Sequence, residues 1–198
     1  MNFKPKKGQY LEILLRSPRT IFTVKDVSLL WGEEATNAVH VRLNSYVKTG
    51  KLIRLCRGIY AKDKKYDEFE LATRIYTPSY ISFETVLTRE GLNFQYYGNI
   101  FLASYLNREI EVDGNRISFV RMKATILTNT AGIEHANGIA RATKERAFLD
   151  RLYVSKDYYF DNLDVLDWEK VFEFLPVYQS KRLERKVKEQ EKTYQDSL

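Results

Sequence analysis

The arrangement of apolar residues in the first 66 positions constrains the fold of this chain more than any other feature. Residues 8–16, 23–31 and 33–49 each carry apolar side chains at helical spacing. Two short β-prone runs, residues 51–56 and 59–62, then flank a central Arg-Gly pair and predict a hairpin. Three short helices followed by a hairpin are the pattern of a winged helix-turn-helix, and the sequence predicts that architecture for residues 1–66.

Local signals set the expected ends of these helices. Pro18 disfavours helix at the residue before it, so the first helix is expected to stop there. Thr23, with Asp26 three residues later, predicts a capped start of the second helix. Gly32 and Gly50 are placed to end the second and third helices.

The charge of the chain is divided unevenly along its length. Residues 1–66 hold 14 Lys and Arg against 5 Asp and Glu, a net charge of +9, whereas residues 67–198 hold 18 against 21, a net charge of −3. A strongly basic segment attracts a phosphate backbone. The sequence therefore predicts two domains, a DNA-binding domain at 1–66 and a second domain at 67–198.

The third predicted helix offers a polar face opposite its apolar stripe. Asn can pair with adenine and Arg with guanine, and Thr or Val can pack against a thymine methyl group, so this face suits the major groove of double-stranded DNA. A solvated helix face has a similar composition, and His40 alone fits a structural role equally well. Basic side chains of the hairpin are expected to reach phosphates or the adjacent minor groove. The expected DNA-binding residues are Thr36, Asn37, His40, Val41, Arg42, Asn44 and Lys48 on the helix, and Arg54, Arg57 and Lys62 on the hairpin.

The second domain mixes helical and β-prone segments, which predicts an α+β fold with a helical C-terminus. Helices are expected at 68–76, from a cap at Ser79 or Ser82 to Gly91, and at 143–153. The β-prone runs lie at 99–105, 109–112, 116–122 and 132–141. Residues 157–178 predict a further helical pair broken at Pro176. Residues 179–192 predict a charged helix, which is either a second basic surface for nucleic acid or a solvated helix.

The composition limits which cellular compartment and which cofactors are expected for this chain. The single Cys56 excludes an intramolecular disulfide, and with only His40 and His135 beside it a Cys/His zinc site lacks ligands. The basic segment Met1–Gly8 is not followed by an uninterrupted apolar run, and no run of about 18 apolar residues occurs. We therefore expect a cytoplasmic protein with no membrane partner, no cofactor and no metal.

Residues that could support catalysis are few. Arg146 and Asp150 are four residues apart on one predicted helix and are expected to form a structural ion pair. The run Asp161, Asp164 and Asp167 does not match a calcium loop. We therefore expect that this protein is not an enzyme. The alternative is a metal-dependent nuclease, or another nucleic-acid enzyme, whose scattered candidate residues are Glu84, Asp113, Glu134 and Lys144.

Three segments, taken in order, resemble the AbiEi antitoxin family of transcriptional regulators. They are Arg57-Gly58-Ile59-Tyr60, the segment Ser79-Tyr80-Ile81-Ser82-Phe83-Glu84, and the run from Ala140 to Asp150. The resemblance covers most of residues 8–155. It implies an antitoxin of a type IV toxin–antitoxin, or abortive-infection, system that represses its own operon by binding its operator. It also implies a nucleotidyltransferase-like toxin as the functional partner, countered with or without direct contact.

Overall fold

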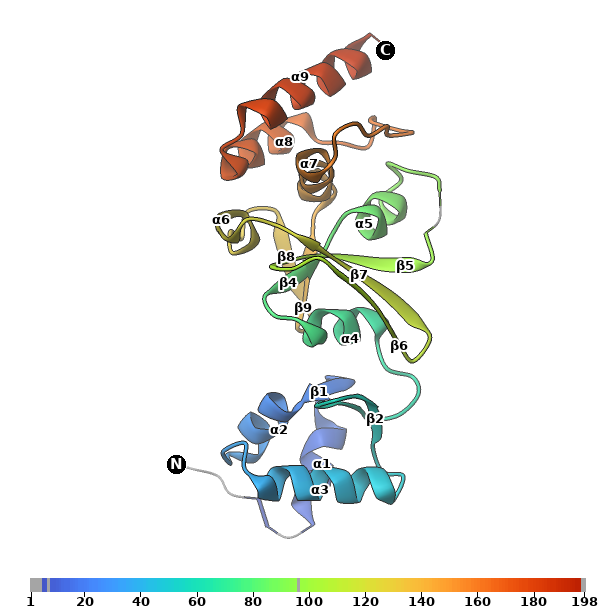
Figure 1. The fold of residues 1–198 in the computed structure, drawn as a ribbon, viewed down its shortest axis with the longest axis vertical. Coiled ribbons are helices and arrows are strands. Elements are labelled where there is room, and N and C mark those ends of the chain that lie inside the picture. The colour runs from blue at the N-terminus through green and yellow to red at the C-terminus, as the bar shows by residue number, and fades with distance from the viewer. Residues whose placement is uncertain (1–4, 7, 96, 197–198) are drawn as a thin grey trace. The chain divides into compact units, whose positions relative to one another are not determined.

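The computed structural model describes residues 5–6, 8–95 and 97–196, and the chain forms two compact units, residues 1–75 and 76–198. Each unit contains helices and a β-sheet (Figure 1), so the predicted α+β class is confirmed. Among the described residues, no helix is both long and apolar enough to cross a membrane.

The first unit is built from short helices around a three-stranded sheet. Its elements are α1 (Gln9–Arg16), β1 (Ile21–Thr23), α2 (Val24–Trp31), α3 (Asn37–Lys48), β2 (Ile53–Cys56), β3 (Ile59–Ala61) and α4 (Glu68–Ile75). The sheet is antiparallel with the order β1-β3-β2. Helix α4 groups with this unit, because Glu70 accepts hydrogen bonds from the backbone N–H groups of Thr20, at 2.8 Å, and Ile21, at 3.3 Å.

The predicted helix signals operate as expected at α2. The Thr23 hydroxyl accepts from the Asp26 N–H at 3.1 Å, and the Asp26 carboxylate accepts from the Thr23 N–H at 2.9 Å, which completes a capping box. Gly32 ends the helix with a φ of 63°, a left-handed conformation that glycine adopts without strain.

The third helix begins later than predicted, and one strand was missed. Glu33 and Glu34 lie before α3, whose N-cap is Thr36. Strand β1 has only three residues, too few to show an alternating pattern, and its pairing with β3 supplies the backbone hydrogen bonds that define it.

An aromatic core fixes the helices of the first unit. Trp31 is fully buried, meets the Tyr10 ring edge-on at 5.1 Å, and donates its indole N–H to the Tyr10 carbonyl at 2.9 Å. Val39 and Leu43 of α3 are fully buried in the same core. Burial of these two side chains fixes which face of α3 points outward.

The second unit is a six-stranded mixed sheet with helices α5 and α7 on one side and α8 and α9 beyond them (Figure 1). The sheet order is β6-β7-β5-β4-β9-β8; β5 runs parallel to β7 and β4 to β9, and the other pairs are antiparallel. The strands are β4 (Ser79–Ile81), β5 (Asn99–Ser104), β6 (Arg108–Val112), β7 (Asn115–Arg121), β8 (Ile133–Ala136) and β9 (Ile139–Ala142). The helices are α5 (Glu84–Arg89), α6 (Ala124–Leu127), α7 (Lys144–Val154), α8 (Trp168–Phe174) and α9 (Lys181–Gln195), with a 3-10 turn at Leu175–Tyr178.

Of the two expected helix caps, Ser79 is wrong, and Ser82 lies one residue before the observed N-cap, Phe83. Ser79–Ile81 is a strand that lies between β5 and β9, and the helix starts only at Glu84. A short apolar run fits a buried strand or a buried helix equally well, and here pairing on both sides decides for the strand. Phe83, with a φ of 53°, makes the turn from strand to helix.

The helical pair predicted for 157–178 is also only partly correct. Residues 157–167 contain no regular helix, and α8 continues through the 3-10 turn in which Pro176 lies. Proline is tolerated there because the first residues of a helical turn need no N–H partner.

Candidate nucleic-acid interface

Helix α3 has an outer face, turned away from the core of its unit, that consists of uncharged side chains and one basic side chain. Asn37, Val41, Asn44 and Lys48 follow one another at three- and four-residue spacing, and all four are exposed. Val41 is 68% exposed, although valine side chains are usually buried. The predicted polar face is therefore free of contacts with the core.

Two further α3 residues lie beside this row. His40 is exposed, and so is Ser45, which sequence reasoning did not select. Ser45 stands four residues after Val41, and helical spacing alone indicates its position. Thr36 is exposed at the N-cap, where its side chain makes no capping hydrogen bond.

Arg42 points toward the interior of its unit. Its guanidinium lies 3.6 Å from the centroid of the Tyr10 ring and forms an ion pair with Glu33 at 3.1 Å. The Tyr10 hydroxyl donates to the same carboxylate at 2.7 Å, and this hydrogen bond raises the pKa of Tyr10. The charge of Arg42 is thereby balanced inside the unit, and its ring contact holds α3 against α1.

The hairpin β2–β3 carries the expected basic residues in two different environments. Arg57 is exposed at the turn, beside Gly58 with its φ of 80°, and Arg54 is exposed on β2. Lys62 instead donates hydrogen bonds to the carbonyl oxygens of Leu15 and Ser17 at the end of α1. These carbonyls have no helical partners, so the Lys62 ammonium acts as a C-terminal cap.

Acidic residues are absent from the segment that contains these elements. No Asp or Glu occurs from Ala35 to Lys62, a stretch that includes all of α3 and the hairpin. Lys51, exposed between α3 and β2, adds a cation that is not among the expected DNA-binding residues. The exposed cations Lys48, Lys51, Arg54 and Arg57 therefore have no acidic neighbours within this segment.

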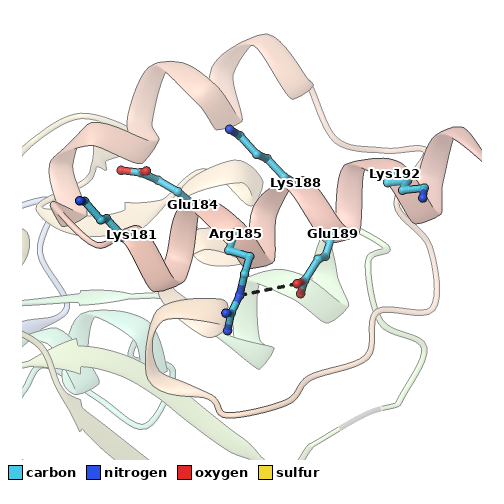
Figure 2. A pocket seen from close by; sticks show the side chains of 6 residues that line it. All are labelled: Lys181, Glu184, Arg185, Lys188, Glu189 and Lys192. Carbon is cyan, nitrogen blue, oxygen red and sulfur yellow. Dashed lines mark ion pairs between the residues drawn. The ribbon is translucent and has the colours of Figure 1, made fainter.

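A second charged surface lies on α9. Figure 2 shows Lys181, Glu184, Arg185, Lys188, Glu189 and Lys192 along this helix, with Arg185 and Glu189 in an ion pair at 3.6 Å. The opposite side buries Leu183 and Val187 against the unit.

Two of the basic residues of α9 attach it to α7. Arg182 donates to the Tyr153 carbonyl at 2.6 Å, and Lys186 donates to the carbonyls of Leu152 and Ser155. Burial lowers the pKa of Lys186. The remaining charges on the outer side have both signs, which is typical of a solvated helix face.

The buried Arg146–Asp150 pair is the centre of a closed polar network. Both side chains have no solvent exposure, and they approach to 3.3 Å, which confirms the expected ion pair. Three hydroxyl groups donate to the Asp150 carboxylate: those of Tyr178 at 2.6 Å, Ser82 at 2.8 Å and Tyr80 at 2.9 Å. Burial raises the pKa of Tyr80 and of Tyr178 well above the ordinary value, so both remain donors.

The Arg146 guanidinium completes this network. It donates to the carbonyl oxygens of Ala131 and Ile126, each at 2.7 Å, and to the Tyr80 hydroxyl at 3.0 Å. Every charged group is paired inside the unit and none reaches solvent. The arrangement connects β4, α7 and the 3-10 turn, and it has the properties of a structural ion pair.

The residues considered for an enzyme are dispersed among structural contacts. Glu84 pairs with Arg151 at 3.0 Å, and the Asp161 carboxylate accepts from the Phe94 N–H at 2.8 Å. Asp167 caps α8, and the hydrogen bond from the Lys170 N–H lowers its pKa. Over the part of the chain that the structure describes, no three His, Cys, Asp or Glu side chains form a group that could hold a metal ion.

No family model matches this chain, and no curated protein matches it either. The residues and contacts described above are therefore the basis for assigning its function.

Proposed function

We propose that the first unit is a winged helix-turn-helix that binds double-stranded DNA. The observation that carries the proposal is the acid-free stretch 35–62, whose exposed side chains lie on the outer face of α3 and on the β2–β3 hairpin. Helix α3 then enters the major groove, and the hairpin is the wing that follows the backbone. The element order from α1 to β3 supports this arrangement.

The α3 face has side chains suited to reading bases. The amides of Asn37 and Asn44 can pair two-fold with adenine, and Val41 can pack on a thymine methyl group. From Asn37 to Lys48 the helix rises about 16 Å, which corresponds to about five base pairs. Lys48, Lys51, Arg54 and Arg57 are assigned to phosphates. Arg42 and Lys62 are left out of the contact set because they are held inside the unit.

We further propose that the chain represses its own operon as an antitoxin of a type IV toxin–antitoxin system. The support is the resemblance in three segments, two of which meet in the second unit: Ile81 of β4 pairs with Arg141 of β9. Tyr80 and Ser82 of one segment also donate to Asp150 of the other. The resemblance in this unit thus falls on residues that contribute to its folded structure.

The experiment for DNA binding is a gel-shift titration with the DNA upstream of the chain's own reading frame. We expect salt-sensitive binding to an inverted or direct repeat, and intact DNA when magnesium is added. Absence of binding at low salt would contradict the proposal. Cleavage that is lost in the Glu84→Ala variant would favour a nuclease instead.

The experiment for the antitoxin role is a growth assay. We expect a nucleotidyltransferase-like reading frame directly downstream of the gene. This frame is expressed from one plasmid, and the chain from another. Expression of the chain is expected to restore growth, and a growth defect that persists at full expression of the chain would contradict this role while leaving DNA binding unaffected.

Removing Arg57 tests the wing. Arg57→Ala is expected to weaken binding to upstream and random DNA by the same factor and to lower the slope of log K against log salt by about one. Fluorescence anisotropy at several salt concentrations measures both. Arg116→Ala, which removes an exposed arginine from β7 of the second unit, is the control and should leave the slope unchanged. An effect of Arg57→Ala on upstream DNA alone would place Arg57 on a base edge.

A further inference from the structure

The second unit contains a recess at the carboxyl ends of two parallel strands. Strands β5 and β7 run parallel, and the chain leaves them at Tyr105 and at Arg121. Two cavities of about 670 and about 750 Å³ adjoin there and share Arg121, Lys123 and Tyr153 in their walls. In open sheets with parallel strands, ligands commonly bind at this end of the strands, and the volumes fit a small molecule.

The recess is positively charged, whereas the second unit as a whole carries almost no net charge. Its walls contain Arg121, Lys123 and Arg182, and none of the residues that line the two cavities is Asp or Glu. The unit 76–198 as a whole holds 17 Lys and Arg against 18 Asp and Glu. Three cations gathered in a concave, acid-free wall attract an anion.

The cations of the recess are available to a ligand to different degrees. Arg182 is held by its hydrogen bond to the Tyr153 carbonyl. Among the described residues, neither Arg121 nor Lys123 has an ion-pair partner, and both are exposed. These two side chains can therefore contact a phosphate group without breaking an existing ion pair.

The other wall of the recess is apolar and aromatic. Pro78, Met122, Leu127 and the rings of Tyr105 and Tyr153 line it. Tyr105 is 48% exposed, so much of its ring can be covered by a ligand. A planar base stacks favourably on such a ring. A ligand that satisfies both walls carries a phosphate and a planar aromatic group.

We propose that this recess binds a nucleoside phosphate, with the phosphate on Arg121 and Lys123 and the base against Tyr105. The site belongs to the second unit and is separate from the DNA contacts proposed for α3 and the hairpin. The same chemistry is offered by a free nucleotide and by the terminal nucleotide of a strand, and the experiment includes both.

Methionine NMR gives a probe inside the recess of the full chain. The sequence contains two methionines, Met1 and Met122, and Met122 lines the recess. The chain, labelled with methyl-¹³C methionine, is titrated with the four ribonucleoside 5′-monophosphates, inorganic phosphate, adenosine and a short 5′-phosphorylated oligonucleotide. We expect the Met122 methyl signal to shift with at least one monophosphate at concentrations up to about 1 mM, and the Met1 signal to stay in place.

The different ligands of the titration distinguish a free nucleotide from a strand end, and nucleotide binding from binding of phosphate or nucleoside alone. If the Met122 signal shifts with the monophosphate, the ligand of the recess is a free nucleotide. If it shifts more strongly with the oligonucleotide, the ligand is the end of a strand. An equal response to inorganic phosphate, a response to adenosine alone, or no response to any nucleotide would overturn the proposal. A response of the Met1 signal without a response of Met122 would overturn it as well.

Variants locate the two halves of the site. Arg121→Ala/Lys123→Ala is expected to weaken nucleotide binding at least about tenfold. The matched control Arg116→Ala/Lys156→Ala removes the same charge from outside the recess and should bind as the unaltered chain does. Tyr105→Leu should weaken binding of the nucleotide and leave the response to inorganic phosphate unchanged. Equal loss in the double variant and its control would contradict the site.

Discussion

Replacement of Asp150 by alanine is expected to lower the free energy of unfolding of the second unit by about 3–5 kcal/mol. The substitution leaves the Arg146 guanidinium fully buried without its counter-charge. It also removes the acceptor of the Tyr80, Ser82 and Tyr178 hydroxyls. Loss of one member of a buried charged network is costly because the other groups stay desolvated.

The two tryptophans allow this loss to be measured in one unit. Trp31 lies in the first unit and Trp168 in the second, so the Trp31→Phe background leaves Trp168 fluorescence as the reporter of urea unfolding. Glu189→Ala is the matched control, because Glu189 forms an exposed pair with Arg185 at the same four-residue spacing. This control should change the free energy by less than about 0.5 kcal/mol. An Asp150→Ala chain as stable as the control would show that the network does not stabilise the unit.

The Asn44→Ala variant is expected to lose about 1–3 kcal/mol of binding free energy on the upstream DNA and nothing on random DNA. Asn44 is exposed at the middle of the outer face of α3, where its amide can pair with one base. The loss should disappear when the contacted base pair of the operator is changed. Anisotropy titrations on both DNAs measure the difference.

The control for this substitution removes a side-chain amide from α9 of the second unit. Gln195→Ala shortens an exposed side chain at the end of α9 and should leave binding to both DNAs unchanged. Equal losses for Asn44→Ala on upstream and random DNA would mean that α3 contacts the backbone and not the bases.

Elements with strong local signals were predictable from the sequence. The Asp113-Gly114 pair takes φ values of 50° and 80° and makes the tight turn of the hairpin between β6 and β7, as an Asp-Gly pair between two β-prone runs favours. Helix α7 starts after Thr143, whose hydroxyl accepts from the Arg146 N–H. Here the residue types alone determine the local backbone, because only a few of them fit such turns and caps.

Elements that depend on distant partners were not predictable. Strand β4 forms because β5 and β9 lie on either side of it, and this pairing is not visible in the run Ser79–Phe83. Strand β1, whose last residue Thr23 is also the N-cap of α2, likewise depends on β3. Tertiary pairing overrides the local pattern in both cases.

The candidate interface was predictable as a face but not in its details. Helical spacing was sufficient to place Asn37, Val41 and Asn44 on one outward side of α3. Spacing could not show that Arg42 stacks on Tyr10 or that Lys62 caps α1, because both contacts bring together residues far apart in the sequence. The recess at Arg121 was missed for the same reason, since its walls come from separate strands and helices.

Photo-crosslinking from α3 tests whether this helix lies in the major groove of the bound DNA. A photoreactive benzoylphenylalanine replaces Val41, which is 68% exposed on α3, or Leu15, which is 51% exposed on α1. The full chain is then irradiated with its upstream DNA and with random DNA. We expect a crosslink to the upstream DNA from position 41 and none from position 15. A crosslink from position 15 alone, or no crosslink from position 41 to bound DNA, would contradict the docking of α3 in the major groove.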